Sequence, residues 1–208
     1  MKDRKPADAK LDITLIEANA VYSSSFFSNL YIGGLRTLDS LNHTYDGLGK
    51  LGIKVVIDTV DSVDPGKRTV KTLGGRTFAY DRLVLSPGVD VKYETVPGYS
   101  AAVEHLYPHA YNTSITGKRD LKRILDAMPD GGTFAMVMPS GIYRCPPGPY
   151  ERACMIAHYF KTQKPKSKLV ILDPKKAFSK QAVITEAFET IYKDIIEMNL
   201  SNDIDDYS

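Results

Sequence analysis

One stretch of this chain, residues 133–157, constrains the fold more than any other. It begins with the apolar run TFAMVM at 133–138, which is typical of a buried parallel strand. A turn rich in proline and glycine follows, and an amphipathic run from Glu151 then predicts a helix that ends before Pro165. A strand, a stiff turn and a helix form half of a βαβ unit, so the chain is expected to be an α/β protein.

The turn in this stretch also carries reactive side chains. In open α/β sheets, ligands bind beyond the carboxyl ends of the strands, where this turn would lie. It contains Arg144 and Cys145, and Glu151 follows at the start of the helix. A thiol and a carboxylate held at a rigid strand end indicate a site for chemistry. The alternative is that Cys145 is a small apolar residue packed into the turn.

A strand near the amino terminus ends in an acidic residue. Residues 11–16, LDITLI, alternate in the pattern of a strand, and Glu17 follows directly. In dinucleotide-binding folds, a carboxylate at such a strand end binds a ribose hydroxyl pair, about 20 residues after a G-x-G-x-x-G turn. There is no room for that first strand and turn before residue 11. A solvated loop charge is the alternative for Glu17.

Further elements follow from periodicity and turn residues. Helices are predicted at 38–51, 117–128 and 185–192, and strands at 53–63, 68–73, 76–80, 82–86, 167–172 and 195–199. Gly74-Gly75 between two alternating runs indicates a hairpin, and Gly52 is placed just past a helix end. The strand at 82–86 ends in Ser86, and Gly88 follows two residues later. This turn either lets the backbone approach a cofactor closely or is a simple chain reversal.

The two halves of the chain repeat one pattern, in which a turn and helix lead to a strand that ends in an acid. We therefore expect two Rossmann-like domains, residues 1–114 and 115–208, both incomplete in this chain. In the second domain the acid is Asp173, but prolines occupy the turn where backbone N–H groups would bind a pyrophosphate. The second domain is therefore expected to lack a dinucleotide ligand.

Composition and spacing argue against several other classes of function. A net charge of +2, without a basic cluster interleaved with aromatic residues, gives no reason to expect nucleic acid. No apolar run is long enough to span a bilayer, and the first ten residues lack the apolar segment of a secretory signal. Two cysteines are too few for a zinc site, a bond between Cys145 and Cys154 is not implied, and Cys154 is interpreted as a core residue. His105 and His109 straddle Pro108, which breaks the helical geometry that a metal-binding pair would need.

Six segments together resemble one known family. They are ITLIEANAVY (13–22), SNLYIGG (28–34), YDGLGKLGIKVV (45–56), YDRLVLSPGVD (80–90), YRCPPGPYERA (143–153) and KLVILDPKKAFSKQ (168–181). Over about residues 10–208 the chain resembles the flavoprotein subunit of flavocytochrome c sulfide dehydrogenase. This family is related to the sulfide:quinone oxidoreductases among the disulfide-reductase-type flavoproteins.

The resemblance implies an enzyme that binds FAD in its first domain and oxidises sulfide with a redox-active cysteine pair. Electrons would pass through the flavin to a cytochrome c partner, generally in the periplasm. Cys145 matches the first redox cysteine, and Glu151 matches an acidic residue beside it that could accept a proton. Glu17 matches the ligand of the adenosine ribose, while Ser86 and Gly88 match a turn near the cofactor.

The sequence also departs from that family. Ser25 stands where members with covalent flavin have a cysteine, so bound FAD is expected to be non-covalent. The segments that would supply the glycine-rich turn and the second redox cysteine are not in the sequence. The chain therefore resembles an internal fragment, and alone it is expected to bind FAD weakly or not at all and to be catalytically inactive. Two alternatives remain: a pyridine nucleotide-disulfide or quinone oxidoreductase of the same superfamily, and a non-catalytic degenerate flavoprotein that acts as a binding scaffold.

Overall fold

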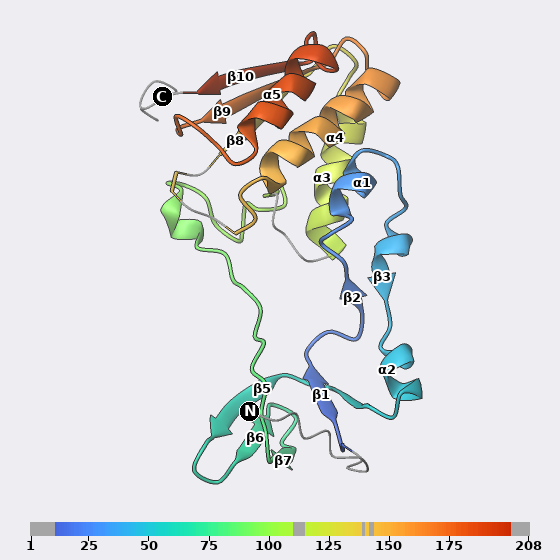
Figure 1. Cartoon of the computed structure of the whole chain (residues 1–208), viewed down its shortest axis with the longest axis vertical. Helices are drawn as coiled ribbons and strands as arrows, with labels where there is room; N and C mark the ends of the chain where they lie inside the picture. Colours follow the sequence, from blue (N-terminus) through green and yellow to red (C-terminus); the bar gives the residue numbers. More distant parts are fainter. Residues whose placement is uncertain (1–10, 110–114, 139, 142–143, 201–208) are drawn as a thin grey trace, which may run out of the picture. The chain divides into compact units, whose positions relative to one another are not determined.

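The computed structural model describes residues 11–109, 115–138, 140–141 and 144–200 (Figure 1). Its contacts divide the chain into two compact units. Unit 1 contains residues 1–22 and 42–90, and unit 2 contains residues 23–41 and 91–208. Both units combine strands and helices, which confirms the predicted α/β class. The predicted sequence domains, divided after residue 114, remain a prediction.

Unit 1 combines a two-stranded parallel sheet with an antiparallel meander. Its elements are β1 (Thr14–Glu17), α2 (Asp46–Lys50), β4 (Lys54–Ile57), β5 (Val60–Asp64), β6 (Thr69–Thr72) and β7 (Thr77–Ala79). β1 pairs with β4 so that Glu17 lies opposite Ile57, and β6 pairs with both β5 and β7. The hairpin predicted at Gly74-Gly75 is confirmed, with Gly75 at φ +81°, a conformation that glycine adopts without strain. The short strands β2 (Tyr22–Ser23) and β3 (Asn42–His43) form a separate pair.

Asp58, in the connection between β4 and β5, forms hydrogen bonds that hold the β6–β7 hairpin in place. Asp58 accepts hydrogen bonds from the N–H of Thr59 at 2.9 Å and of Gly74 at 3.1 Å. Arg76 donates to the same carboxylate from Nε at 3.2 Å and from Nη2 at 2.8 Å. The hydrogen bonds from Arg76 are the largest cause that lowers the pKa of Asp58, to about 2. A Cβ on Gly74 would lie 2.5 Å from Asp58 Oδ2, so only glycine fits this position without a shift of the carboxylate.

The strand predicted at 82–86 is wrong. These residues form no strand, and the side chains of Val84 and Leu85 are 86% and 68% exposed. A strand requires a neighbour that accepts and donates its backbone hydrogen bonds. None of the described strands pairs with this stretch, so its apolar composition alone does not produce extended structure.

The single helix predicted at 38–51 is also wrong. The stretch forms a 3₁₀ turn (Asp39–Leu41), the short strand β3 and the five-residue helix α2. Gly47 and Gly49 weaken a helix, and the Asn-His-Thr run before them has low helix propensity. The predicted helix stop is nevertheless present, because Gly52 follows the C-cap at φ +81°. The predicted strand 53–63 is likewise divided, into β4 and β5.

Unit 2 is built on a three-stranded parallel sheet with the order β10-β9-β8 (Figure 1). Its elements are α1 (Ser28–Ile32), a 3₁₀ turn (Tyr93–Thr95), α3 (Ile115–Ala127), β8 (Thr133–Val137), α4 (Gly148–Gln163), β9 (Lys168–Asp173), α5 (Gln181–Thr190) and β10 (Ile196–Leu200). α4 connects β8 to β9, and α5 connects β9 to β10. The predicted strands and helices of this half are confirmed, with α5 beginning four residues earlier than expected.

One face of this sheet and the helices form the main core. Alternate residues of β9, Leu169 and Ile171, are fully buried, and the register places Phe134 and Met136 of β8 beside them. The period of two in the strands and the apolar positions of α3, α4 and α5 therefore meet in one cluster. The buried members are Ile32, Leu121, Leu125, Met138, Tyr150, Ala153, Ile156, Ala157, Tyr159, Phe160, Leu169, Ile171, Phe188, Tyr192 and Ile195.

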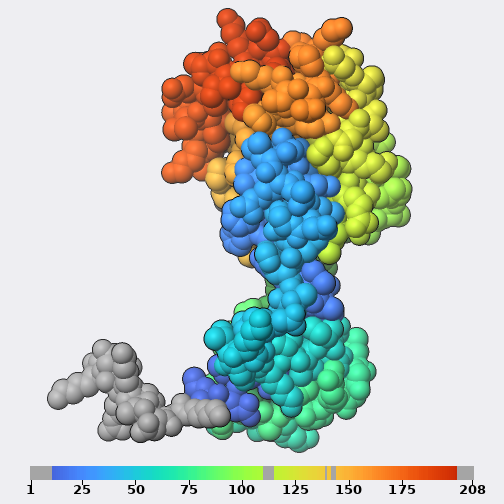
Figure 2. Space-filling view, turned by 90° about the vertical axis from the view of Figure 1, so that its right-hand side faces the viewer, coloured from blue at the N-terminus to red at the C-terminus, as the bar shows by residue number. Residues whose placement is uncertain are grey.

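Residues 23–41 belong to this core although they lie far from it in the sequence. α1 packs against α3 and α4, and Ile32 is fully buried in the cluster. Figure 2 shows this segment in blue, lying against the yellow and orange atoms of α3 and α4. A second tertiary tie comes from Lys164, whose ammonium donates to the carbonyls of Leu125 at 2.6 Å, Asp126 at 2.7 Å and Met128. These carbonyls end α3, where a cation is favoured by the helix dipole.

Candidate functional site

The turn between β8 and α4 holds Cys145 in a left-handed conformation. Its φ is +57°, and a non-glycine residue in this region carries strain of about 1–3 kcal/mol. The carbonyl of Cys145 accepts a hydrogen bond from the N–H of Gly148 at 2.9 Å, which closes the turn. Cys145 is exposed and Pro147 is the N-cap residue of α4. The turn therefore presents a solvent-accessible sulfur at the carboxyl end of a parallel strand.

Glu151 and Cys154 lie one helical turn apart on α4. Glu151 is exposed in the first turn, where the helix dipole favours a carboxylate. Cys154 packs partly buried against the core, which agrees with its interpretation as a core residue. Burial, followed by the charge of Glu151, raises the pKa of the Cys154 thiol to about 11. No disulfide joins Cys154 to Cys145.

The amino-terminal turn of α4 offers few backbone donors to an anion. Pro149 has no N–H, the N–H of Gly148 bonds to Cys145, and the N–H of Glu151 bonds to the carbonyl of Pro147 at 3.1 Å. Dinucleotide folds bind pyrophosphate with the corresponding N–H groups. This geometry supports the prediction that the second domain lacks a dinucleotide ligand.

Asp173, the acid that ends β9, is bound by other side chains of the protein. Asp173 is fully buried and accepts a hydrogen bond from the hydroxyl of Tyr150 at 2.5 Å. Lys175 forms an ion pair with the same carboxylate at 2.7 Å and donates its backbone N–H at 3.0 Å. The ring of Tyr150 stacks on Phe178 with centroids 3.9 Å apart. A carboxylate with these partners has no exposed oxygen to offer a ribose.

The loop that carries Ser25 belongs to unit 2 and is held there by buried polar contacts. Ser25 itself is exposed, whereas Ser24, Ser28 and Asn29 are buried. The guanidinium of Arg152 donates from Nε to Asn29 Oδ1 at 2.9 Å and from Nη2 to Ser28 Oγ at 3.0 Å. Arg152 is only 7% exposed. The structure therefore connects the Ser25 loop to the helix that follows the Cys145 turn.

A second buried cation lies in the first turns of α3. Lys118 is 2% exposed, and its ammonium donates to Ser23 Oγ at 3.1 Å. Burial, followed by the charge of Arg152, lowers the pKa of Lys118 to about 8. Sequence reasoning did not select Lys118 or Arg152, because charged residues in amphipathic helices usually face solvent.

The sequence of unit 2 matches one family. Residues 119–207 match the family model described as sulfide dehydrogenase (flavocytochrome c) flavoprotein chain, central. The predicted resemblance is thereby confirmed for the stretch that contains Cys145, Glu151 and Arg152.

Solved structures share the fold of the whole chain at low sequence identity. The sulfide:quinone oxidoreductase of Aquifex aeolicus is 17% identical with a TM-score of 0.55, and the match covers 91% of this chain and 45% of that one. Putidaredoxin reductase, in its covalent complex with putidaredoxin, is 17% identical with a TM-score of 0.64 over 91% of this chain and 43% of that one. NDH2 from Plasmodium falciparum is 14% identical with a TM-score of 0.65 over 93% and 43%. The chain thus spans less than half the length of these Rossmann-type oxidoreductases.

The remaining residues that the flavocytochrome c resemblance singles out lie in unit 1. Glu17 ends β1, as predicted, and its Oε1 accepts hydrogen bonds from the N–H of Asn19 at 3.0 Å and from its Nδ2 at 3.1 Å. Ser86 and Gly88 are exposed, and Gly88 has a φ of +82°. The roles that the resemblance implies for these residues, and for Ser25, Cys145 and Glu151, remain predictions.

Three glycines in unit 1 have the spacing of a dinucleotide fingerprint without its structure. Gly47, Gly49 and Gly52 match G-x-G-x-x-G, but they lie on and after the five-residue helix α2 and lead into β4. The fingerprint requires the opposite order, in which a strand precedes the glycines and a helix follows. A Cβ at any of the three would meet nothing within 4 Å, so no close backbone approach explains these glycines.

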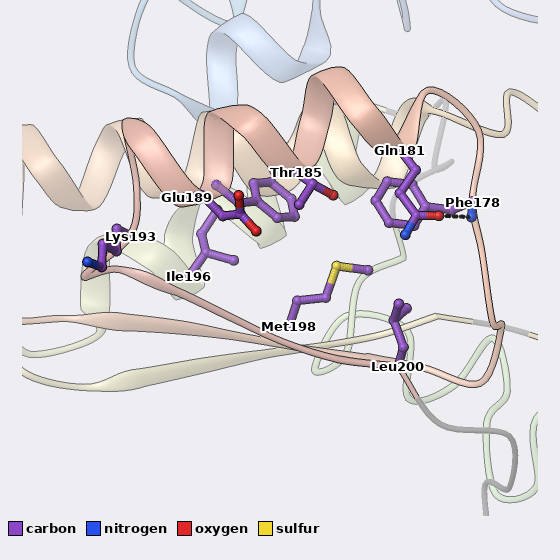
Figure 3. Close-up of a pocket in the computed structure, with 9 residues that line it drawn as sticks. Phe178, Gln181, Thr185, Glu189, Lys193, Ile196, Met198 and Leu200 are labelled. Atoms are coloured by element: carbon purple, nitrogen blue, oxygen red, sulfur yellow. Dashed lines mark hydrogen bonds between the residues drawn. The ribbon is translucent and has the colours of Figure 1, made fainter.

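Two other features of the described residues lie apart from the predicted site. A groove of about 290 Å³ lies between α5 and β10, with an apolar floor that includes Met198 and Leu200 (Figure 3). At one end of the groove, the side chain of Gln181 accepts a hydrogen bond from the N–H of Phe178 at 3.3 Å.

His109 and Glu104 form a second feature, in which the imidazole Nε2 lies 3.4 Å from the carboxylate. Burial is the largest cause that lowers the pKa of His109. No described cluster of His, Cys, Asp and Glu could hold a metal, and no described helix is long and apolar enough to cross a membrane.

Proposed function

We propose that this protein acts in the FAD-dependent oxidation of sulfide, with Cys145 as the redox-active cysteine. The electrons would pass through the flavin to a cytochrome c partner, in the periplasm. The observation that supports this proposal most strongly is the exposed sulfur of Cys145, placed at the carboxyl end of β8 within the segment that matches the flavocytochrome c family.

The surroundings of Cys145 suit an exchange reaction at sulfur. Attack of sulfide on a disulfide requires an accessible sulfur and a leaving thiolate that is stabilised. Cys145 is exposed, and Glu151 lies in the first turn of the helix that follows, where its carboxylate would accept the proton released in the exchange. Cys154 does not suit the role of second redox cysteine, because burial holds its pKa near 11 and it packs against the core.

The described residues fit one part of an FAD molecule. Glu17, partly exposed at the end of a parallel strand, suits the hydroxyl pair of the adenosine ribose. Ser25 has no thiol, so a thioether to the flavin cannot form there. The glycines at 47, 49 and 52 do not form a pyrophosphate turn. We therefore expect non-covalent and weak binding of FAD, which when bound would accept the electron pair from sulfur.

A pyridine nucleotide as electron donor is less well supported. Its binding in the second domain would use the acid at the end of β9 and the N–H groups at the start of α4. Asp173 is buried against Tyr150 and Lys175, and the start of α4 is rich in proline. These contacts favour sulfide over NAD(P)H as the reductant.

The proposal is tested by flavin binding followed by anaerobic reduction. FAD is titrated into the 208-residue chain by equilibrium dialysis, and acid precipitation of the complex should release the flavin into the supernatant. With excess FAD as the two-electron oxidant, sulfide and the free thiol of Cys145 should form a persulfide while their electron pair reduces the flavin. Bleaching of the bound flavin is therefore expected in the wild type and in Cys154→Ser, but not in Cys145→Ser. Turnover with a cytochrome c is not expected, because Cys145 and Cys154 are not joined in a disulfide. Bleaching that is equally fast in Cys145→Ser would refute the role of Cys145.

A further inference from the structure

A buried arginine connects the two segments of unit 2 to which the proposed function assigns flavin and sulfur. Arg152 lies on α4, seven residues after Cys145. Its guanidinium reaches Asn29 and Ser28, at 2.9 Å and 3.0 Å, on a segment more than 120 residues away in the sequence. The connection is therefore tertiary, and these hydrogen bonds add a polar contact to the apolar packing of α1 against α4.

The contact continues through Ser28 to the backbone of Ser25. The hydroxyl of Ser28 accepts from Arg152 and donates to the carbonyl of Ser25 at 2.7 Å. The N–H of Ser28 bonds to the same carbonyl at 3.2 Å. An uninterrupted chain of hydrogen bonds thus runs from α4 to the exposed residue at the tip of the loop.

The arrangement requires the shape of an arginine. Nε and Nη2 of one planar fork reach two acceptors, while a lysine ammonium at the same place could not match both in the same directions. The guanidinium is nearly fully buried, so a lost partner is not replaced by water at low cost. One turn further along α4, the chain leaving α1 is in close contact, since a Cβ on Gly33 would lie 3.3 Å from the carbonyl of Met155.

We propose that Arg152 is a positioning residue that holds the Ser25 loop in register with the Cys145 turn. This role rests on the proposed function, with the flavin lying near Ser25, the position of the flavin-linking cysteine in the family that the chain resembles, and with Cys145 supplying the reacting sulfur. The geometry between flavin and sulfur is then set inside unit 2, by Arg152 and its two acceptors. A displacement of about 1 Å at a reacting centre can reduce a rate by about a hundredfold.

The positional part of the proposal is tested without flavin. In a Cys154→Ser background, spin labels are attached to Cys145 and to a cysteine introduced by Phe26→Cys, because Phe26 is 86% exposed. Electron paramagnetic resonance then gives the distribution of distances between the labels. In Arg152→Lys the distribution should become about twofold broader, because one of the two acceptors loses its donor.

Two controls separate positioning from a general loss of structure. A second label pair, Cys145 with Val183→Cys, should keep its distribution in Arg152→Lys, because Val183 is exposed on α5 whereas Ser28 and Asn29, which accept from Arg152, lie on α1. The matched variant is Arg123→Lys, at an exposed arginine that pairs with Asp120 one turn away on α3, and it should leave both distributions unchanged. An unchanged distribution between Phe26→Cys and Cys145 in Arg152→Lys would overturn the proposal, and so would equal broadening of both pairs.

The functional part uses the flavin reduction described above. At saturating FAD, bleaching by sulfide should be about 10- to 100-fold slower in Arg152→Lys, with the dependence on sulfide concentration nearly unchanged. A broader distance distribution with an unchanged bleaching rate would show that Arg152 positions the loop but would refute the claim that this positioning sets the rate of flavin reduction. If the wild-type chain is not bleached at all, the proposed function fails, while the distance measurement still decides whether Arg152 positions the loop.

Discussion

Removal of the Tyr150 hydroxyl should show how much its hydrogen bond to Asp173, the acid that ends β9, contributes to the stability of unit 2. The hydroxyl donates at 2.5 Å to Asp173, whose side chain is fully buried. A hydrogen bond to a buried charged group contributes about 1.5–3 kcal/mol, and part of this loss is not recovered because water cannot replace the donor. We therefore expect Tyr150→Phe to lower the free energy of unfolding of unit 2 by about 2–3 kcal/mol.

The same helix offers a matched control. The hydroxyl of Tyr159 donates to Asp126 at 2.6 Å, but the side chain of Asp126 is 50% exposed. Solvent screens that interaction, so Tyr159→Phe should cost only about 0.5–1 kcal/mol. Both variants lose one phenol oxygen from α4, and they differ in the burial of the carboxylate that remains.

Urea unfolding at pH 7, followed by far-ultraviolet circular dichroism, gives both values. With a slope of about 2 kcal/mol per molar urea, Tyr150→Phe should shift the midpoint of unit 2 by about 1–1.5 M. Tyr159→Phe should shift it by less than half as much. Equal shifts in the two variants, or a larger shift in Tyr159→Phe, would show that burial of Asp173 does not govern the strength of its hydrogen bond.

Two further changes test the packing and the thiols. Lys164→Met should lower the free energy of unfolding of unit 2 by about 2–3 kcal/mol, because three carbonyls at the end of α3 lose a buried donor. In the same urea assay, the control Lys161→Met, at an exposed position of α4, should lower it by less than about 0.5 kcal/mol. At pH 8 a maleimide should modify Cys145 rapidly and leave Cys154 intact, because a pKa raised to about 11 leaves little thiolate there until the pH approaches that value. Mass spectrometry of peptides decides the second prediction, and equal labelling of both cysteines at pH 8 would contradict it.

The sequence predicted unit 2 well because its signals are local. The strand at β8, the proline-rich turn, the helix α4 and the strand β9 each have their own pattern of apolar and turn residues. The strand predicted at 82–86 failed because a strand also needs a partner, and a partner is not encoded in the strand itself. The helix predicted at 38–51 was wrong because the prediction relied on the spacing of apolar residues, whereas in the folded chain Gly47 and Gly49 destabilise a long helix.

In the candidate site too, sequence patterns point to residues that lie at turns or strand ends but not to a residue whose environment comes from a distant segment. The sequence pattern located Cys145, Glu151 and the acid at the end of β9, since each follows from a turn or a strand end. Arg152 was not found, because its neighbour Glu151 is exposed and nothing nearby indicates that the guanidinium is buried. Its burial arises from Ser28 and Asn29, which local periodicity cannot connect to α4.

Because unit 2 is formed by two stretches far apart in the sequence, its first stretch cannot fold fully while the chain is being synthesised. Asn29 leaves the ribosome 123 residues before its partner Arg152. At roughly 5–20 residues per second, the nascent chain holds α1 without its partner helix for roughly 6–25 seconds. During that interval Ile32, which is fully buried in the finished protein, has no core to enter. The early segment is therefore the part of the nascent chain for which binding by a chaperone would matter most.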